Sequence, residues 1–227
     1  MDCVDYAMLA EDAYSEEETL QMIARAGWTR IWRTSERATG FACALYRKGE
    51  TPDHVLAYRG TNPTEFGDLV ADIGIGLRRL TPQFVLALSS FGTAAFHAGG
   101  DQKIVGVCGH SLGGALAKFV GARNGKLTYS FNGPGIAGMG GVTRETDTGD
   151  IRNVNARGDA VSKYGARLGR TETVSISSMG LLPDSLEGFT AGLGGVVGVG
   201  AYLLSQHSIS NLRAKLQTLP AHRRPFA

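Results

Sequence analysis

A sharp turn between a short apolar strand and a helix constrains this chain more than any other feature. Residues 103–108 are β-branched and almost uncharged, which predicts a buried strand, and residues 112–123 form a helical run. The turn between them, residues 109–113, matches G-x-S-x-G, the spacing of a nucleophile elbow with Ser111 strained and exposed to a reactant. The flanking strand and helix favour this interpretation over an ordinary glycine-rich turn.

Two residues near this turn offer hydrogen-bond donors to a developing negative charge. Leu112 begins the helix, so its backbone N–H is free at the positive end of the helix dipole. Thr61 follows the apolar residues 54–59 and offers a backbone N–H and a hydroxyl. These are candidate oxyanion donors, although the Arg-Gly-Thr sequence before Asn62 also suits a simple turn.

Composition and charge are those of a globular protein and exclude several other classes. The 227 residues are 43% hydrophobic, enough for one sizeable core, so we expect a single domain over residues 1–227. A net charge of +2 without a basic block argues against nucleic acid as a partner. The three scattered cysteines lack the spacing of a disulfide framework or a metal site, which indicates buried or free thiols in a reducing compartment.

The N-terminus carries no pattern typical of a Sec signal peptide. Its first residues are acidic and no apolar run follows them. We therefore expect a protein that is cytoplasmic or exported by a signal-independent route to a target membrane.

The periodicity of apolar residues predicts an α/β fold with a central, mostly parallel sheet flanked by helices. Three closely spaced segments at the start predict an antiparallel meander at the sheet edge. The predicted strands lie at residues 28–33, 40–47, 54–59, 103–108, 127–132, 151–155 and 173–177. The predicted helices lie at residues 4–9, 20–26, 82–97, 112–123 and 212–219. A capping box of Ser15 and Glu18 would open the second helix, Thr81 would cap the third, and the tail beyond Pro220 would fray.

Residues 188–206 form a second informative segment, because they contain no charged residue. Their length is borderline for a membrane span, and their many glycines make a poor isolated helix. We favour a segment buried on the sheet, with an apolar lid or lipid-contacting surface and a true span as alternatives.

An activated serine needs a base and an acid that orients the base, and in α/β hydrolases these follow in the order Ser, Asp or Glu, His. Only His207 and His222 lie downstream of Ser111, and His222 lies between prolines in the tail. Asp159 follows the end of a predicted strand, where open α/β sheets place their chemistry. The other aspartates considered were Asp147, Asp150 and Asp184. We therefore predict Ser111, His207 and Asp159 as the catalytic residues.

The sequence resembles the class 3 lipase family in three motifs. They are Ala57-Tyr58-Arg59-Gly60-Thr61-Asn62, Gly109-His110-Ser111-Leu112-Gly113-Gly114, and Asn155-Ala156-Arg157-Gly158-Asp159-Ala160-Val161. The resemblance covers residues 54–161 and implies an α/β-hydrolase fold, lipase or phospholipase A1-type chemistry, and an oxyanion hole from Thr61 and Leu112. Two departures are the alanine at position 160, where proline is usual, and the absence of a recognisable lid.

Together these features predict a serine hydrolase that cleaves lipid or phospholipid acyl esters at a membrane surface. Ser111 would attack the ester carbonyl, His207 would transfer the proton and Asp159 would orient the imidazole, with no metal or organic cofactor. The alternatives are a soluble short-chain carboxylesterase and a catalytically inactive lipase-like binding module. The resemblance also implies an injected bacterial effector as one setting, which would require a neutralising protein partner.

Overall fold

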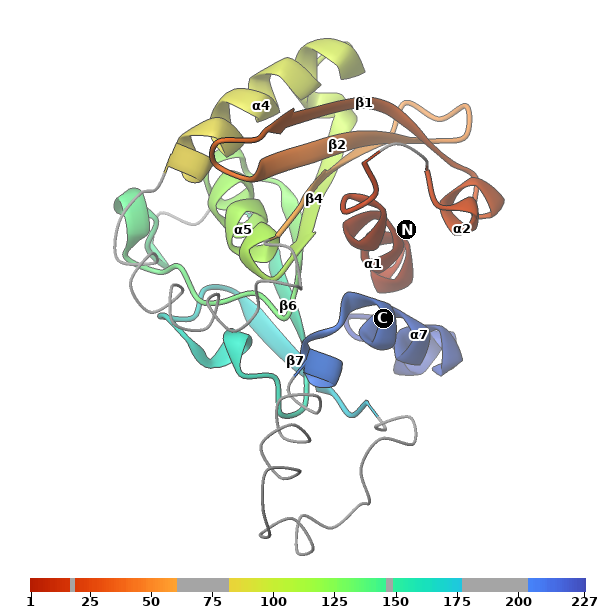
Figure 1. Cartoon of the computed structure of the whole chain (residues 1–227), viewed down its shortest axis with the longest axis vertical. Coiled ribbons are helices and arrows are strands. Elements are labelled where there is room, and N and C mark those ends of the chain that lie inside the picture. The colour runs from red at the N-terminus through yellow and green to blue at the C-terminus, as the bar shows by residue number, and fades with distance from the viewer. Residues whose placement is uncertain (17–18, 61–81, 146–148, 177–203) are drawn as a thin grey trace, which may run out of the picture.

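The computed structural model describes residues 1–16, 19–60, 82–145, 149–176 and 204–227. Within these residues a seven-stranded sheet has its strands in chain order (Figure 1). The strands are β1 (Trp28–Glu36), β2 (Phe41–Lys48), β3 (His54–Tyr58), β4 (Ile104–His110), β5 (Leu127–Phe131), β6 (Ile151–Ala156) and β7 (Arg170–Val174). The first three strands pair antiparallel, and β3 to β7 pair parallel. This confirms the predicted mostly parallel sheet with an antiparallel N-terminal meander.

Helices cover both faces of this sheet. They are α1 (Cys3–Asp12), α2 (Gln21–Arg25), α4 (Pro82–Ala98), α5 (Leu112–Asn124) and α7 (Ile209–Thr218). Helices α4 and α5 lie on one face, while α1 and α7 lie together on the other (Figure 1). Successive side chains of a strand point to opposite faces, so Leu45 packs in the core with Phe119 of α5. The next residue, Tyr46, packs in the core with Leu9 of α1 and Leu212 of α7.

The centre of the sheet carries the turn that dominates the sequence. Strand β4 lies between β3 and β5 and leads directly into α5. The helix is rich in glycine and alanine and is buried from Gly113 to Ala122, because small side chains let it pack closely on the strands. It ends at Gly125, whose φ of 62° is a left-handed conformation that glycine adopts without strain.

The start of α2 differs from the predicted capping box. The helix follows Leu20, which makes no side-chain cap, and the Leu20 N–H instead donates to the Asp12 carboxylate over 2.6 Å. Asp12 is fully buried and also accepts a hydrogen bond from the Tyr46 hydroxyl. A carboxylate of the preceding helix therefore fixes this turn, in place of Ser15; Glu18 lies outside the described residues.

Strand β7 begins three residues earlier than predicted, at Arg170 in place of Thr173. Its backbone pairs with β6, with Arg170 opposite Arg152 and Val174 opposite Ala156. As an edge strand it exposes most of its side chains, so apolar alternation does not mark its bounds.

The C-terminal tail was predicted to fray, and the structure shows the opposite. Arg224 forms an ion pair with Asp2, and the Phe226 N–H donates to a Glu172 oxygen over 3.2 Å. The Phe226 ring also packs edge-on against Tyr129. Charge and aromatic contacts with residues distant in sequence hold this segment, and local composition gives no sign of them.

Two sequence predictions concern burial and membrane spanning. Cys3, Cys43 and Cys108 are buried free thiols, as predicted. None of the helices in the described ranges has the length and hydropathy needed to cross a membrane. Residues 188–203 lie outside the described residues, so the predictions for them are not tested; residues 204–207 form a helical turn before α7.

Candidate active site

Ser111 occupies a strained turn between β4 and α5. Its φ of 58° and ψ of −129° are unusual for a residue with a side chain, and such strain is typical of functional turns. A Cβ atom on Gly109 would overlap the Gly113 backbone, and one on Gly113 would overlap the Tyr58 carbonyl oxygen. The glycines of the motif are therefore required by the close approach of β3, β4 and α5.

The backbone of Ser111 is held firmly while its hydroxyl is not. The N–H donates to the Phe131 carbonyl over 3.0 Å, and the carbonyl accepts from the Gly114 N–H over 2.9 Å. The residue is 1% exposed, and its Oγ makes no hydrogen bond to any described residue. The turn therefore fixes the backbone of Ser111 and leaves its hydroxyl available to a reacting group.

Of the two predicted oxyanion donors, the structure describes Leu112 but not Thr61. Leu112 is the first residue of α5, so its N–H has no carbonyl partner within the helix. Thr61 lies outside the described residues. The residue before it, Gly60, packs against the elbow, since a Cβ there would lie 3.1 Å from Ser111 Cβ.

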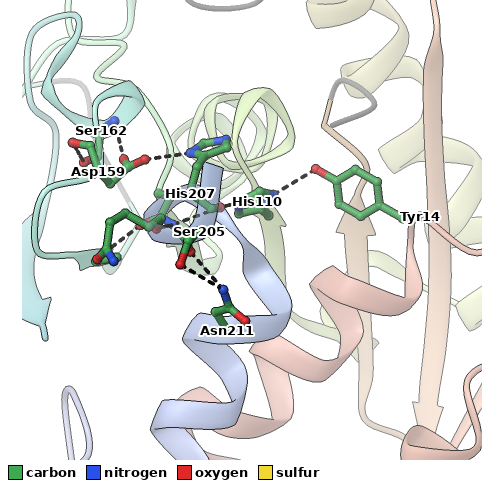
Figure 2. A network of polar contacts seen from close by, with 10 residues as sticks. Tyr14, His110, Asp159, Ser162, Ser205, His207 and Asn211 are labelled. Carbon is green, nitrogen blue, oxygen red and sulfur yellow. Dashed lines mark hydrogen bonds and ion pairs between the residues drawn. The ribbon is translucent and has the colours of Figure 1, made fainter. Parts of the chain in front are cut away.

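His207 and Asp159 are brought together although 48 residues separate them in the chain. His207 Nδ1 lies 2.7 Å from Asp159 Oδ1, and the side chains are 7% and 0% exposed (Figure 2). The second carboxylate oxygen, Oδ2, accepts from the Ser162 N–H over 2.7 Å. Both oxygens of Asp159 are therefore held, which fixes the carboxylate in a position to orient the imidazole.

His207 is the last residue of the helical turn 204–207, just before α7, and side chains at or just after the ends of strands β4 and β5 hold its backbone. Its carbonyl oxygen accepts from His110 Nε2 over 2.6 Å and from Asn132 Nδ2 over 3.2 Å. The His207 and His110 rings lie 4.6 Å apart between centroids. Because His110 immediately precedes Ser111, the His207 imidazole lies beside the elbow.

His110 is buried beneath the elbow and uses both ring nitrogens in contacts within the protein. Its ring is 3% exposed, and burial lowers its pKa well below the usual value, with the nearby His207 adding to the effect. Figure 2 shows the ring between His207 and Tyr14, whose hydroxyl lies 2.9 Å from His110 Nδ1. The alternative base, His222, is exposed in a short turn, Ala221–Arg223, beyond α7.

Asn132 is a site residue that the sequence analysis missed. It follows β5 with a φ of 48°, donates to the Gln206 carbonyl and accepts from the Ala156 N–H over 2.7 Å. It therefore joins the ends of β5 and β6 to the segment that carries His207. Its only sequence signal is the position before Gly133-Pro134, where asparagine tolerates a left-handed conformation.

Lys118 was also missed. It is 1% exposed, and its ammonium donates to the carbonyls of Gly133 and Pro134 and to Asn153 Oδ1. Burial lowers its pKa to about 7. Lys118 thus ties α5 to the loop after β5, and no pattern in the sequence distinguishes it from an exposed lysine. Among the described residues, no cluster of His, Cys, Asp and Glu is large enough to hold a metal ion.

Comparison with known families gives this geometry a context. The sequence model of a phospholipase-like family, described as a Tle-like phospholipase domain, matches residues 5–167. The chain belongs to the Tle-like phospholipase domain family. The match includes Ser111, Leu112 and Asp159, whereas His207 lies beyond its end. No curated protein matches the sequence.

Solved structures show where the fold of this Tle-like domain recurs. It is similar to a mutant form of MDLA from Penicillium cyclopium, with a TM-score of 0.61, 16% identity, and coverage of 93% of this chain and 95% of that chain. A triacylglycerol lipase from Penicillium expansum matches with a TM-score of 0.53 and 18% identity, and the match covers 76% of this chain and 78% of that chain. A lipase from Rhizopus microsporus var. chinensis matches with a TM-score of 0.54 and 16% identity, and the match covers 75% of this chain and 72% of that chain. The Tle-like domain therefore has a lipase-like α/β-hydrolase fold.

Proposed function

We propose that this protein hydrolyses acyl esters of membrane phospholipids through Ser111, His207 and Asp159. The observation that carries the proposal is the buried 2.7 Å contact between His207 and Asp159 beside the strained Ser111 turn. A serine on a tight strand-to-helix turn, a histidine and a buried carboxylate are the parts of a nucleophilic triad. The phospholipase-like family supports a lipid substrate.

In this mechanism, Ser111 Oγ attacks the ester carbonyl carbon as His207 Nε2 takes the hydroxyl proton. Asp159 accepts from Nδ1–H and stabilises the imidazolium that forms. Negative charge develops on the former carbonyl oxygen, and the N–H of Leu112 and the donors of Thr61 stabilise it. The intermediate then expels the alcohol, which takes the proton from His207 and leaves an acyl group on Ser111.

The second half of the reaction releases the acid. His207 takes a proton from a water molecule, which attacks the acyl-enzyme carbonyl. The new intermediate collapses, Ser111 recovers its proton from His207, and a free fatty acid departs. The net change is the addition of one water to one ester, and the steps of this mechanism require no metal or organic cofactor.

Product analysis tests this proposal against the two alternatives. The wild type and Ser111→Ala are incubated with phosphatidylethanolamine and phosphatidylcholine vesicles and with a soluble butyrate ester, and products are identified by mass spectrometry. We expect fatty acid and lysophospholipid from wild type alone, with faster turnover of vesicles than of the soluble ester. Hydrolysis of the soluble ester only would favour a carboxylesterase. No Ser111-dependent hydrolysis of any ester would favour an inactive binding module.

A further inference from the structure

The side chain of Tyr14 connects two parts of the candidate site without belonging to the triad. It follows α1, far in sequence from every residue of the three motifs, and its hydroxyl contacts both Gly60 and His110. We propose that Tyr14 and His110 are positioning residues. They hold His207 and the turn before Thr61 in the positions that catalysis requires. This inference rests on the proposed function.

The contacts of His110 fix the position of its proton. Its Nε2 lies 2.6 Å from the His207 carbonyl oxygen, which can only accept, so Nε2 carries the hydrogen. In the neutral ring Nδ1 is then an acceptor, and the Tyr14 hydroxyl, 2.9 Å away, donates to it. Both nitrogens are thereby used. His110 cannot exchange a proton with substrate, and its ring serves as a rigid link from Tyr14 to the His207 backbone.

Tyr14 also reaches the turn that leads to Thr61. The backbone of Gly60 packs closely on the Tyr14 phenol oxygen, because a Cβ on Gly60 would lie 2.5 Å from that oxygen. The same Cβ would lie 2.5 Å from the His110 carbonyl oxygen. The Tyr14 hydroxyl therefore packs against Gly60 and donates to the His110 ring, so a shift of either residue disturbs the other.

The position of the His207 imidazole relative to Ser111 should affect the rate more than the strength of any single hydrogen bond affects stability. His207 and Asp159 meet through side chains, but where the imidazole lies relative to Ser111 depends on the His207 backbone. That backbone is held by two side-chain donors to its carbonyl, His110 and Asn132. Displacement of a reacting group by about 1 Å costs roughly 100-fold in rate, whereas loss of one neutral hydrogen bond changes stability only modestly. A positioning role thus predicts a rate loss out of proportion to the loss of stability.

A second tyrosine, Tyr46, provides a matched control, because its hydroxyl holds the same segment at Asp12. Asp12, two residues before Tyr14, is held by the Tyr46 hydroxyl over 2.7 Å, on the same segment but outside the link to His110. Tyr46→Phe therefore loosens the segment that carries Tyr14 and leaves the Tyr14 hydroxyl in place. Tyr14→Phe removes that hydroxyl and keeps the ring. If Tyr14 only stabilises the fold, both variants will have the same effect.

The experiment measures kcat, KM and thermal midpoint for Tyr14→Phe, Tyr46→Phe, His110→Gln, His110→Leu and the Tyr14→Phe/His110→Leu double variant. We expect Tyr14→Phe to lower kcat about 10-fold at nearly unchanged KM, and Tyr46→Phe to lower the midpoint without changing kcat. His110→Gln keeps an N–H directed at the His207 carbonyl, so it should retain more activity than His110→Leu. In the His110→Leu background, Tyr14→Phe should have little further effect on kcat.

Nitrogen NMR of the imidazoles adds a readout that does not depend on turnover. In wild type His110 should remain a single Nε2–H tautomer across neutral pH, and in Tyr14→Phe the two tautomers should mix. Active wild type with unchanged kcat in Tyr14→Phe and His110→Leu, or with equal losses in Tyr14→Phe and Tyr46→Phe, would overturn the positioning role alone. An inactive wild type would overturn the proposed function and this inference with it.

Discussion

The imidazole of His207 is hydrogen-bonded through Nδ1 to Asp159 Oδ1 over 2.7 Å, and both side chains are nearly inaccessible to water. The pair joins the end of β6 to the segment before α7, two parts of the chain that share no local sequence pattern. Because the second oxygen of Asp159 is held by the Ser162 N–H, the carboxylate cannot rotate freely. The imidazole is therefore oriented before any substrate binds, which is the condition for an efficient general base.

Asp159→Asn should lower kcat on the order of 10³-fold or more with the fold intact. The amide can still accept from the Ser162 N–H, but it can present a donor to His207 Nδ1 and so favour the wrong tautomer. The matched control is Asp150→Asn, which alters the exposed pairs with Arg152 and Arg170. Steady-state kinetics on vesicles compares the two; equal losses would refute the role of Asp159.

The two downstream histidines should differ sharply on substitution. His207→Ala should reduce kcat on the order of 10⁴-fold or more, and combining it with Ser111→Ala should cost little extra, because a triad acts as a unit. His222 is exposed beyond α7, so His222→Ala should leave kcat within about twofold. Loss of turnover in the His222 variant, with circular dichroism unchanged, would show that the base has been assigned wrongly.

Asn132 should affect stability and rate together. Asn132→Ala removes hydrogen bonds to Gln206, His207 and Ala156 and keeps a φ of 48°, so we expect about 2–4 kcal/mol of destabilisation. Asn132→Gly relieves the backbone strain and should recover about 1 kcal/mol. Both variants should lose the same factor in kcat, because both release the His207 carbonyl. Urea unfolding and kinetics measure this; full activity in Asn132→Gly would mean that Asn132 serves the fold only.

Lys118 should give the folded protein a distinct dependence on pH. Its pKa is about 7 when buried and 10.5 ordinarily, so between these values the unfolded chain binds the extra proton. Stability then rises with pH across this interval, and below pH 7, where both states are protonated, the contribution is constant. We expect the free energy of unfolding of wild type to rise from pH 7 to about 9.5 relative to that of Lys118→Met.

The control for this experiment is Lys126→Met, because Lys126 donates to the Asp101 carbonyl at the surface. Its difference from wild type should not change with pH over the same interval. Parallel curves for wild type and Lys118→Met would show that Lys118 keeps its ordinary pKa inside the protein.

The arrangement of strands could be predicted because β-branched runs and short turns are local signals. Strand β4, the elbow and α5 follow directly from residues 103–123, and the position of Asp159 follows from the end of β6. The bounds of β7 and the start of α2 could not be predicted in this way. Backbone pairing with β6 sets the first, and the buried Asp12 carboxylate sets the second.

The parts of the site that were missed act through contacts between distant segments. Tyr14 meets His110 across 96 residues and Asn132 meets His207 across 75, and nothing in their neighbours marks them. His222 was set aside because the tail was expected to fray. The tail is in fact held by Arg224 and Phe226, and His222 is exposed within it.

The most direct test of the account is to ask whether Ser111 is an activated nucleophile. The folded protein is treated with a fluorophosphonate, which labels a serine only when a base assists its attack, and the adduct is located by peptide mass spectrometry. We expect one adduct on the peptide containing Ser111, absent in Ser111→Ala and strongly slowed in His207→Ala. A folded wild type that stays unlabelled, or labelling that persists unchanged in His207→Ala, would contradict the account.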